Sequence, residues 1–246
     1  MLRKCAPKPV WQWWRTRRDE ADNRHRAETL RAAVQGIRAL EQGEVPGAEL
    51  LGQLREGWGN PDYAAELSYL KEVARLAVLA ERPILECGTG VTTLLIALLA
   101  GSRGVPIYCL EHDKQWADHV NRTLTDLDIA GADVLFAPII SYGEFHWYSA
   151  PIYLLPDRFD LVICDGPPER GTHGGRFGLM PVLGERFDRD TKILVDDTAT
   201  QAGSTMVNHW CATGRWCSEL SVPEQRGMAL LTRADAGMLA DAALAV

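Results

Sequence analysis

Short apolar runs alternate with amphipathic segments from residue 83 onward, and this alternation limits the possible folds more than any other feature. Such runs suit strands buried on both faces, and the segments between them carry apolar residues at helical spacing. We therefore expect an α/β fold: a seven-stranded, mostly parallel, Rossmann-like sheet with helices on both faces and an antiparallel last pair. The expected strands cover residues 84–87, 107–111, 134–137, 159–164, 192–195, 216–221 and 227–232, and the expected helices cover 92–100, 113–127, 179–187 and 200–213.

The chain before this region has a helical pattern. Apolar residues recur at intervals of three and four across residues 30–40, and a further helix is expected over residues 62–80. We divide the chain into an N-terminal helical extension, residues 1–61, and a main domain, residues 62–246. The extension is expected to serve as a lid or an oligomerisation surface.

Three tryptophans, Trp11, Trp13 and Trp14, lie close together in the extension. Exposed tryptophans at this density are typical of a surface that a partner covers. The pattern favours a homodimer, and a lid over the active site is the alternative.

Charge is spread unevenly along the chain. The formal net charge is -7, yet residues 1–31 carry nine basic and four acidic side chains, which leaves an acidic remainder. An acidic body argues against nucleic acid as the main partner. No apolar run approaches the roughly 18 residues that span a bilayer, so no membrane insertion is expected. Six scattered cysteines without zinc spacing and the lack of a signal peptide indicate a cytoplasmic protein.

A glycine-rich turn follows the first expected strand, where the sequence is Glu86-Cys87-Gly88-Thr89-Gly90. Gly88 and Gly90 allow a tight turn and a close approach of backbone to a ligand. Ligands of open α/β sheets bind beyond the carboxyl ends of the strands, where this turn is expected. The turn is therefore the first candidate for a nucleotide site.

The next expected strand ends in Glu111, about 20 residues beyond the turn, which is the position of a ribose-binding carboxylate. Dinucleotide sites use a third glycine, but the corresponding stretch is Val91-Thr92-Thr93. Glu86 would also repel a pyrophosphate, whereas it suits a cationic ligand. These residues disfavour an NAD-dependent oxidoreductase.

At these motifs the sequence resembles the class I S-adenosylmethionine (SAM)-dependent methyltransferases, over roughly residues 62–232. The phrases Glu111-His112-Asp113 and Asp165-Gly166-Pro167-Pro168 are similar to a bacterial subgroup that acts on small molecules. No acidic residue follows the third strand, so the adenine contacts are assigned to Ala137 and Ser141. The resemblance implies SAM contacts from Glu86, Gly88, Thr89, Gly90, Thr92, Glu111, His112, Ala137, Ser141 and Asp165.

Three carboxylates, Asp165, Asp196 and Asp197, follow adjacent expected strands, so they are expected to converge. Like charges raise one another's pKa, and a bound Mg²⁺ or Ca²⁺ would relieve the repulsion. The arrangement is similar to the metal-dependent catechol-type O-methyltransferases, which implies that these three residues are metal ligands. The alternatives are that Asp165 orients the SAM amino group or the following turn, and that Asp197 caps the next helix.

A candidate catalytic base follows Asp165 in the chain. His173 lies in a polar, glycine-containing loop after Asp165, and imidazole has a suitable pKa for accepting a proton. A solvated loop histidine is the alternative. Arg170 and Arg176 in the same loop are candidates for holding an anionic substrate.

Together these features favour an enzyme that transfers a methyl group from SAM to a small-molecule acceptor, with Asp165 and His173 in catalysis. The acceptor atom is expected to be oxygen, with divalent-metal assistance. An N-methyltransferase, a metal-independent methyltransferase and a non-catalytic SAM-binding module are the alternatives.

Overall fold

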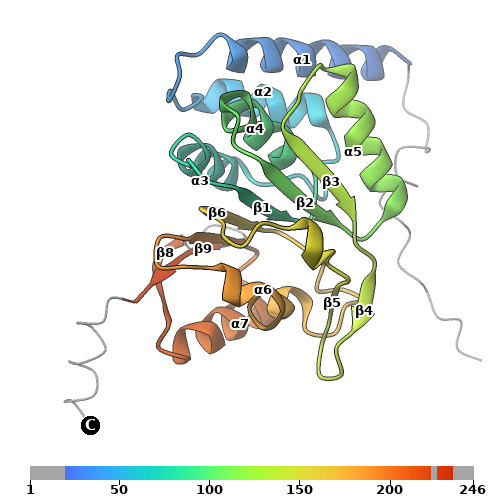
Figure 1. Ribbon diagram of the computed structural model, residues 1–246. Coiled ribbons are helices and arrows are strands. Elements are labelled where there is room, and N and C mark those ends of the chain that lie inside the picture. The colour runs from blue at the N-terminus through green and yellow to red at the C-terminus, as the bar shows by residue number, and fades with distance from the viewer. Residues whose placement is uncertain (1–19, 223–225, 235–246) are drawn as a thin grey trace, which may run out of the picture.

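The computed structural model describes residues 20–222 and 226–234. Figure 1 shows one central sheet with helices on both faces, as the sequence predicts. Its strands are β1 (Ile84–Cys87), β2 (Ile107–Glu111), β3 (Ala132–Phe136), β6 (Leu161–Cys164), β7 (Lys192–Asp196), β8 (Trp216–Val222) and β9 (Met228–Arg233). The strand order is β3-β2-β1-β6-β7-β9-β8.

The topology brings three strand ends together. Neighbours from β3 to β7 run parallel, and β9 is antiparallel to both β7 and β8. The chain leaves β1 toward β2 on one side and later returns to β6 on the other, so a crevice opens beyond these carboxyl ends. Cys87 pairs in register with Leu110 of β2 and Cys164 of β6. Gly88, Glu111 and Asp165 therefore follow at the same edge of the sheet.

Side chains alternate along the strands between two cores. Ile84 and Ile163 point to a core that includes Leu94 of α4 and Val120 of α5. Leu85 points to the opposite core, which α6 and α7 cover (Figure 1). The helices are α1 (Glu20–Arg38), α2 (Ala48–Trp58), α3 (Leu67–Ala77), α4 (Val91–Leu99), α5 (Lys114–Asp126), α6 (Leu179–Leu183) and α7 (Gln201–Ala212).

The N-terminal helices belong to the first of these cores. Leu30 of α1 and Leu51 of α2 are buried in the same cluster as Leu94. A Cβ at Gly57 would lie 2.4 Å from the backbone nitrogen of Leu30, so only glycine permits this close approach of α1 and α2. This packing brings the segment after α2 to the carboxyl edge of the sheet.

Two helices are shorter than the sequence pattern predicts. The helix expected over residues 62–80 is limited to α3, because the backbone oxygen of Asn60 accepts bonds from Tyr63 and Ala64 and closes a turn first. The segment over 179–187 is divided into α6 and a 3-10 turn, Gly184–Arg186.

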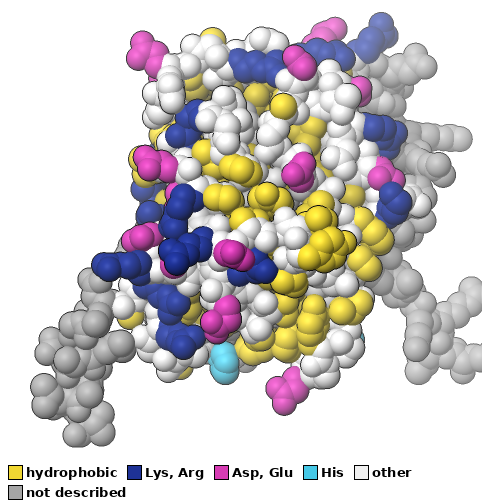
Figure 2. All heavy atoms as spheres, viewed as in Figure 1, with side chains coloured by type: hydrophobic (Ala, Val, Ile, Leu, Met, Phe, Trp, Pro, Cys, Tyr) yellow, Lys and Arg dark blue, Asp and Glu magenta, His cyan; other side chains and the backbone are white. Residues whose placement is uncertain are grey.

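A hairpin that sequence reasoning did not predict lies between β3 and β6. Its antiparallel strands are β4 (Ile139–Ser141) and β5 (His146–Tyr148). Apolar side chains gather over this region in Figure 2, and the exposed ones include Phe136, Ile140 and Tyr153.

Within the described residues, no helix is long and apolar enough to cross a membrane. Trp11, Trp13 and Trp14, which motivate the homodimer, lie outside the described residues.

Candidate active site

A cavity of about 550 Å³ opens beyond the carboxyl ends of β1, β2 and β6. Its lining comes from the glycine turn, the ends of β2 and β6, the start of α5, and the segment after α2. Of the residues predicted from sequence, those that line it are Gly88, Thr89, Gly90, Thr92, Glu111, His112, Asp165, Arg170, Arg176 and Asp197.

The glycine turn forms the floor of this cavity. Gly88 has a φ of 86°, and a Cβ there would lie 3.0 Å from the backbone nitrogen of Gly166, so two features require glycine. A Cβ at Gly90 would meet no protein atom within 4 Å. The space beside Gly90 is therefore open for a ligand to approach the start of α4.

Glu86 lies beneath this turn and does not line the cavity. Its side chain is fully buried, and its Oε2 accepts a 2.6 Å bond from Thr93 Oγ1, which in turn accepts from the backbone nitrogen of Gly90. Burial raises the pKa of Glu86 to about 7, against hydrogen bonds from Thr92 and Thr93 that lower it. Glu86 thus shapes the turn from below.

Glu111 ties the end of β2 to the turn. Its Oε2 accepts from the backbone nitrogen and Oγ1 of Thr89, at 3.1 and 2.8 Å, and its Oε1 accepts from the backbone nitrogen of Asp113 at 2.9 Å. The His112 Nδ1 lies 2.9 Å from the same Oε1. Burial alone would raise the pKa of Glu111, but His112 and these backbone donors lower it on balance. Glu111 is therefore ionised at neutral pH, and it lines the cavity.

Two buried polar groups outside the predicted set of cofactor contacts also line the cavity. The Tyr148 hydroxyl and the Asn60 Oδ1 are buried and have no hydrogen-bond partner among the described residues. Asn60 has a φ of 54°, in a region that asparagine tolerates better than most residues. Orphaned polar groups are costly without a partner, so both favour a polar ligand in the cavity. The aromatic stretch over residues 145–148 indicates packing beside the cofactor cleft, whereas nothing in the sequence around Asn60 indicates a role in the site.

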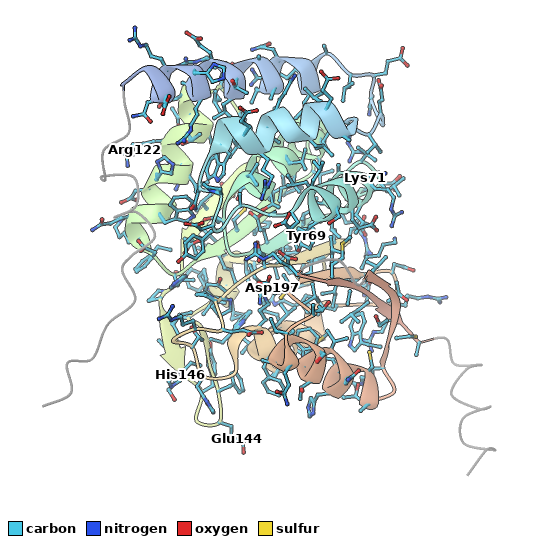
Figure 3. All side chains as sticks on the ribbon, turned by 180° about the vertical axis from the view of Figure 1, so that it is seen from behind. Tyr69, Lys71, Arg122, Glu144, His146 and Asp197 are labelled. Atoms are coloured by element: carbon cyan, nitrogen blue, oxygen red, sulfur yellow. The ribbon has the colours of Figure 1, made fainter. Side chains whose placement is uncertain are left out.

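The three predicted carboxylates converge. Asp165, Asp196 and Asp197 each offer an oxygen, and these oxygens lie within 4.8 Å of one another. Figure 3 shows Asp197 near the centre of the molecule. Burial and the neighbouring carboxylates raise the pKa of Asp196, and burial also raises that of Asp165.

Two arginine side chains pair with two of these three acids. Arg176 Nη2 donates to Asp165 Oδ1 at 3.0 Å and to Asp197 Oδ2 at 2.7 Å, and Arg226 Nε lies 2.9 Å from Asp197 Oδ1. A divalent cation would need these same oxygens at roughly 2.0–2.6 Å. The side chains as they stand therefore do not fit a metal ion. The sequence makes Arg176 a candidate for binding substrate, but its buried guanidinium bonds the acids.

Asp197 does not cap α7 through its side chain. Thr200 Oγ1 accepts from the backbone nitrogen of Gly203 at 2.9 Å and takes that role. Asp197 instead has a φ of 58°, and its carboxylate turns toward Arg176.

Three other predicted residues lie outside the cavity lining. Ser141 is exposed on β4, where its Oγ accepts from Gly143, and Ala137 is buried under the end of β2. His173 packs its ring against that of His146, at a centroid distance of 6.1 Å. Figure 3 shows His146 on the hairpin, well away from Asp197. His173 follows β6 and is joined to the hairpin by a 2.7 Å bond from the His146 backbone nitrogen to the His173 backbone oxygen, and it does not line the cavity.

The fold recurs in solved methyltransferases. The SAH-bound methyltransferase PaMTH1 from Podospora anserina aligns with a TM-score of 0.57 at 13% identity, over 95% of this chain and 100% of that one. Cofactor-bound Rv0187 from MTB has a TM-score of 0.53 at 17% identity, over 94% and 99%. The O-methyltransferase TomG from Streptomyces achromogenes, in complex with SAM, has a TM-score of 0.51 at 18% identity, over 78% and 92%. No protein-family model and no curated protein matches the chain. At these identities the likeness establishes the fold alone.

Proposed function

We propose that this chain is a SAM-dependent methyltransferase whose acceptor is an oxygen atom of a small molecule. The observation that carries the proposal is Glu111, which lies at the end of β2 and is bonded to Thr89 in the glycine turn. A carboxylate so placed accepts bonds from the two hydroxyls of a ribose. The likeness to SAM-bound and SAH-bound methyltransferases supports the same ligand.

The residues of the cavity fit SAM better than a dinucleotide. Asn60 Oδ1 is an acceptor in need of a donor, and the Tyr148 hydroxyl also lacks a partner. The α-amino group of SAM is a donor, and its adenosine offers both donors and acceptors. The open space beside Gly90 admits backbone contact, while no third glycine makes room for a pyrophosphate. When bound, SAM supplies a sulfonium methyl group to a nucleophile and leaves as S-adenosylhomocysteine (SAH).

Asp165 is the residue that we assign to proton transfer. It lines the cavity, and burial raises its pKa, which makes its carboxylate a stronger base. In this role the proton of the acceptor hydroxyl passes to the Asp165 carboxylate as the acceptor oxygen forms its bond to the methyl carbon. Arg176 keeps Asp165 ionised before transfer. His173 would have to move to serve as the base, so it is assigned no role.

The segment after α2 is proposed to close the acceptor side. Asn60 and Tyr63 of this segment line the cavity, together with Trp58 at the end of α2. Trp58 packs edge-on to Trp116, whose Nε1 donates to the backbone oxygen of Thr89 at 2.8 Å. This contact couples the wall to the turn, so the N-terminal extension would act as part of the site.

Transfer of label tests the reaction. The chain would be incubated with methyl-labelled SAM and separate pools of small hydroxylated compounds and amines. We expect label in a hydroxylated compound, and loss of transfer with retained SAH binding in Asp165→Asn. Label in the amine pool instead would replace oxygen by nitrogen as the acceptor atom. Turnover unaffected in Asp165→Asn would contradict the proton-transfer role.

A further inference from the structure

Arg176 is a buried cation at the base of the cavity. It lies in the 3-10 turn Gly175–Gly178, and its side chain is only 3% exposed. Its Nη2 donates to the Asp165 backbone oxygen at 2.7 Å as well as to the carboxylates of Asp165 and Asp197. A buried guanidinium with three such bonds is held in one position.

Two of the three acids are paired with guanidinium groups. Asp165 contacts Arg176, and Asp197 contacts both Arg176 and Arg226. The third acid, Asp196, is 2% exposed and its Oδ2 has no hydrogen-bond partner among the described residues. The two guanidinium groups thus pair with the two carboxylates that line the cavity.

Removal of Arg176 would leave the Asp165 carboxylate without its guanidinium partner and Asp197 with Arg226 alone. Three carboxylates whose oxygens lie within 4.8 Å of one another would keep one cation fewer, and the unpartnered Asp196 Oδ2 would remain beside them. Oxygen-rich, uncompensated sites of this kind suit Mg²⁺ and Ca²⁺. The Arg176 guanidinium therefore bonds the oxygens that a divalent cation would otherwise bind.

We propose that Arg176 is a built-in counter-ion that takes the place of a divalent metal, so that the wild-type chain binds no metal at Asp165, Asp196 and Asp197. Replacing Arg176 by a neutral residue opens a Mg²⁺ or Ca²⁺ site there. In turnover, a consequence that rests on the proposed function, the acceptor needs no pair of adjacent oxygens to chelate a metal.

Metal titration of the full chain tests this proposal without any assay of turnover. Wild type, Arg176→Lys and Arg176→Gln would be titrated with CaCl₂ and MgCl₂ by calorimetry. We expect no saturable binding by wild type or Arg176→Lys at millimolar metal. Arg176→Gln should bind Ca²⁺ at least about tenfold more tightly than wild type, and Asp196→Asn added to it should abolish the gain.

Two results would overturn the proposal. One is saturable Mg²⁺ or Ca²⁺ binding by wild type that Asp196→Asn removes. The other is a folded Arg176→Gln variant, with wild-type SAH binding, that gains no metal affinity. The wild-type titration decides the question even where Arg176→Gln does not fold. SAH binding is measured separately without metal. Its absence would contradict the proposed function without deciding the metal proposal.

Discussion

Glu111 and Thr89 are joined by two hydrogen bonds, from the Thr89 backbone nitrogen and Oγ1 to the same carboxylate oxygen of Glu111. Glu111 ends β2, and Thr89 belongs to the glycine turn, 22 positions earlier in the chain. The pair holds the turn in shape and places a carboxylate beside it. The strand end therefore carries a carboxylate in a fixed position at the cavity, as the proposed ribose site requires.

We expect Glu111→Gln to weaken SAH binding by about ten- to a hundredfold. Charge-assisted bonds to two hydroxyls contribute about 1.5–3 kcal/mol, and each 1.4 kcal/mol is a factor of ten. Calorimetry with SAH measures the change, and Glu144→Gln, on the exposed tip of the hairpin, is the matched control (Figure 3). Equal affinity in both variants would remove Glu111 from the site.

Tyr148→Phe separates ligand contact from packing. The hydroxyl is buried without a partner among the described residues, so its loss should leave the free energy of unfolding unchanged or raise it by up to about 1 kcal/mol. If a ligand supplies the missing partner, SAH affinity should fall by about tenfold. Thermal unfolding and calorimetry on the same sample measure both effects. A variant that binds SAH as wild type does would argue against the contact.

Two variants of Asn60 test whether its side-chain oxygen contacts the ligand. Asn60→Asp keeps an acceptor oxygen and Asn60→Gly removes it, and both residues tolerate the φ of 54°. We expect the Gly variant to fold but to bind SAH several-fold more weakly, while the Asp variant retains binding. Identical SAH affinity of the Gly variant and wild type would assign Asn60 to backbone geometry alone.

Glu86 should make stability depend on pH. Burial raises its folded pKa to about 7 from an ordinary value of 4.5, so the folded state holds its proton more tightly than the unfolded state. The free energy of unfolding then falls as pH rises from about 4.5 to 7, and changes no further through Glu86 above that. Glu86→Gln should remove this loss, which amounts to at most about 3 kcal/mol at pH 8.

Urea unfolding of wild type and Glu86→Gln at pH 5 and pH 8 measures this effect. The gap between the two proteins should widen toward pH 8 in favour of Gln. A constant gap would mean that Glu86 has an ordinary pKa in the folded protein.

The sequence predicted the parts of the site that follow strand ends. Gly88 and Glu111 are tied to the carboxyl edge by the strands before them, so their convergence follows from a parallel sheet. Arg176 and Arg226 could not be predicted as counter-ions, because their partners are brought near only by packing of loops. Neither Ser141 nor His173 lines the cavity, and the hairpin β4–β5 that carries Ser141 has no clear strand pattern in the sequence.

Titration of the wild-type chain with SAH is the most direct test of the central claim, that the cavity at Gly88–Gly90 and Glu111 is a SAM site. Calorimetry should give saturable binding with one ligand per chain, and NADH should neither bind nor compete. Absence of SAH binding at near-millimolar ligand, or tighter binding of NADH, would contradict the account.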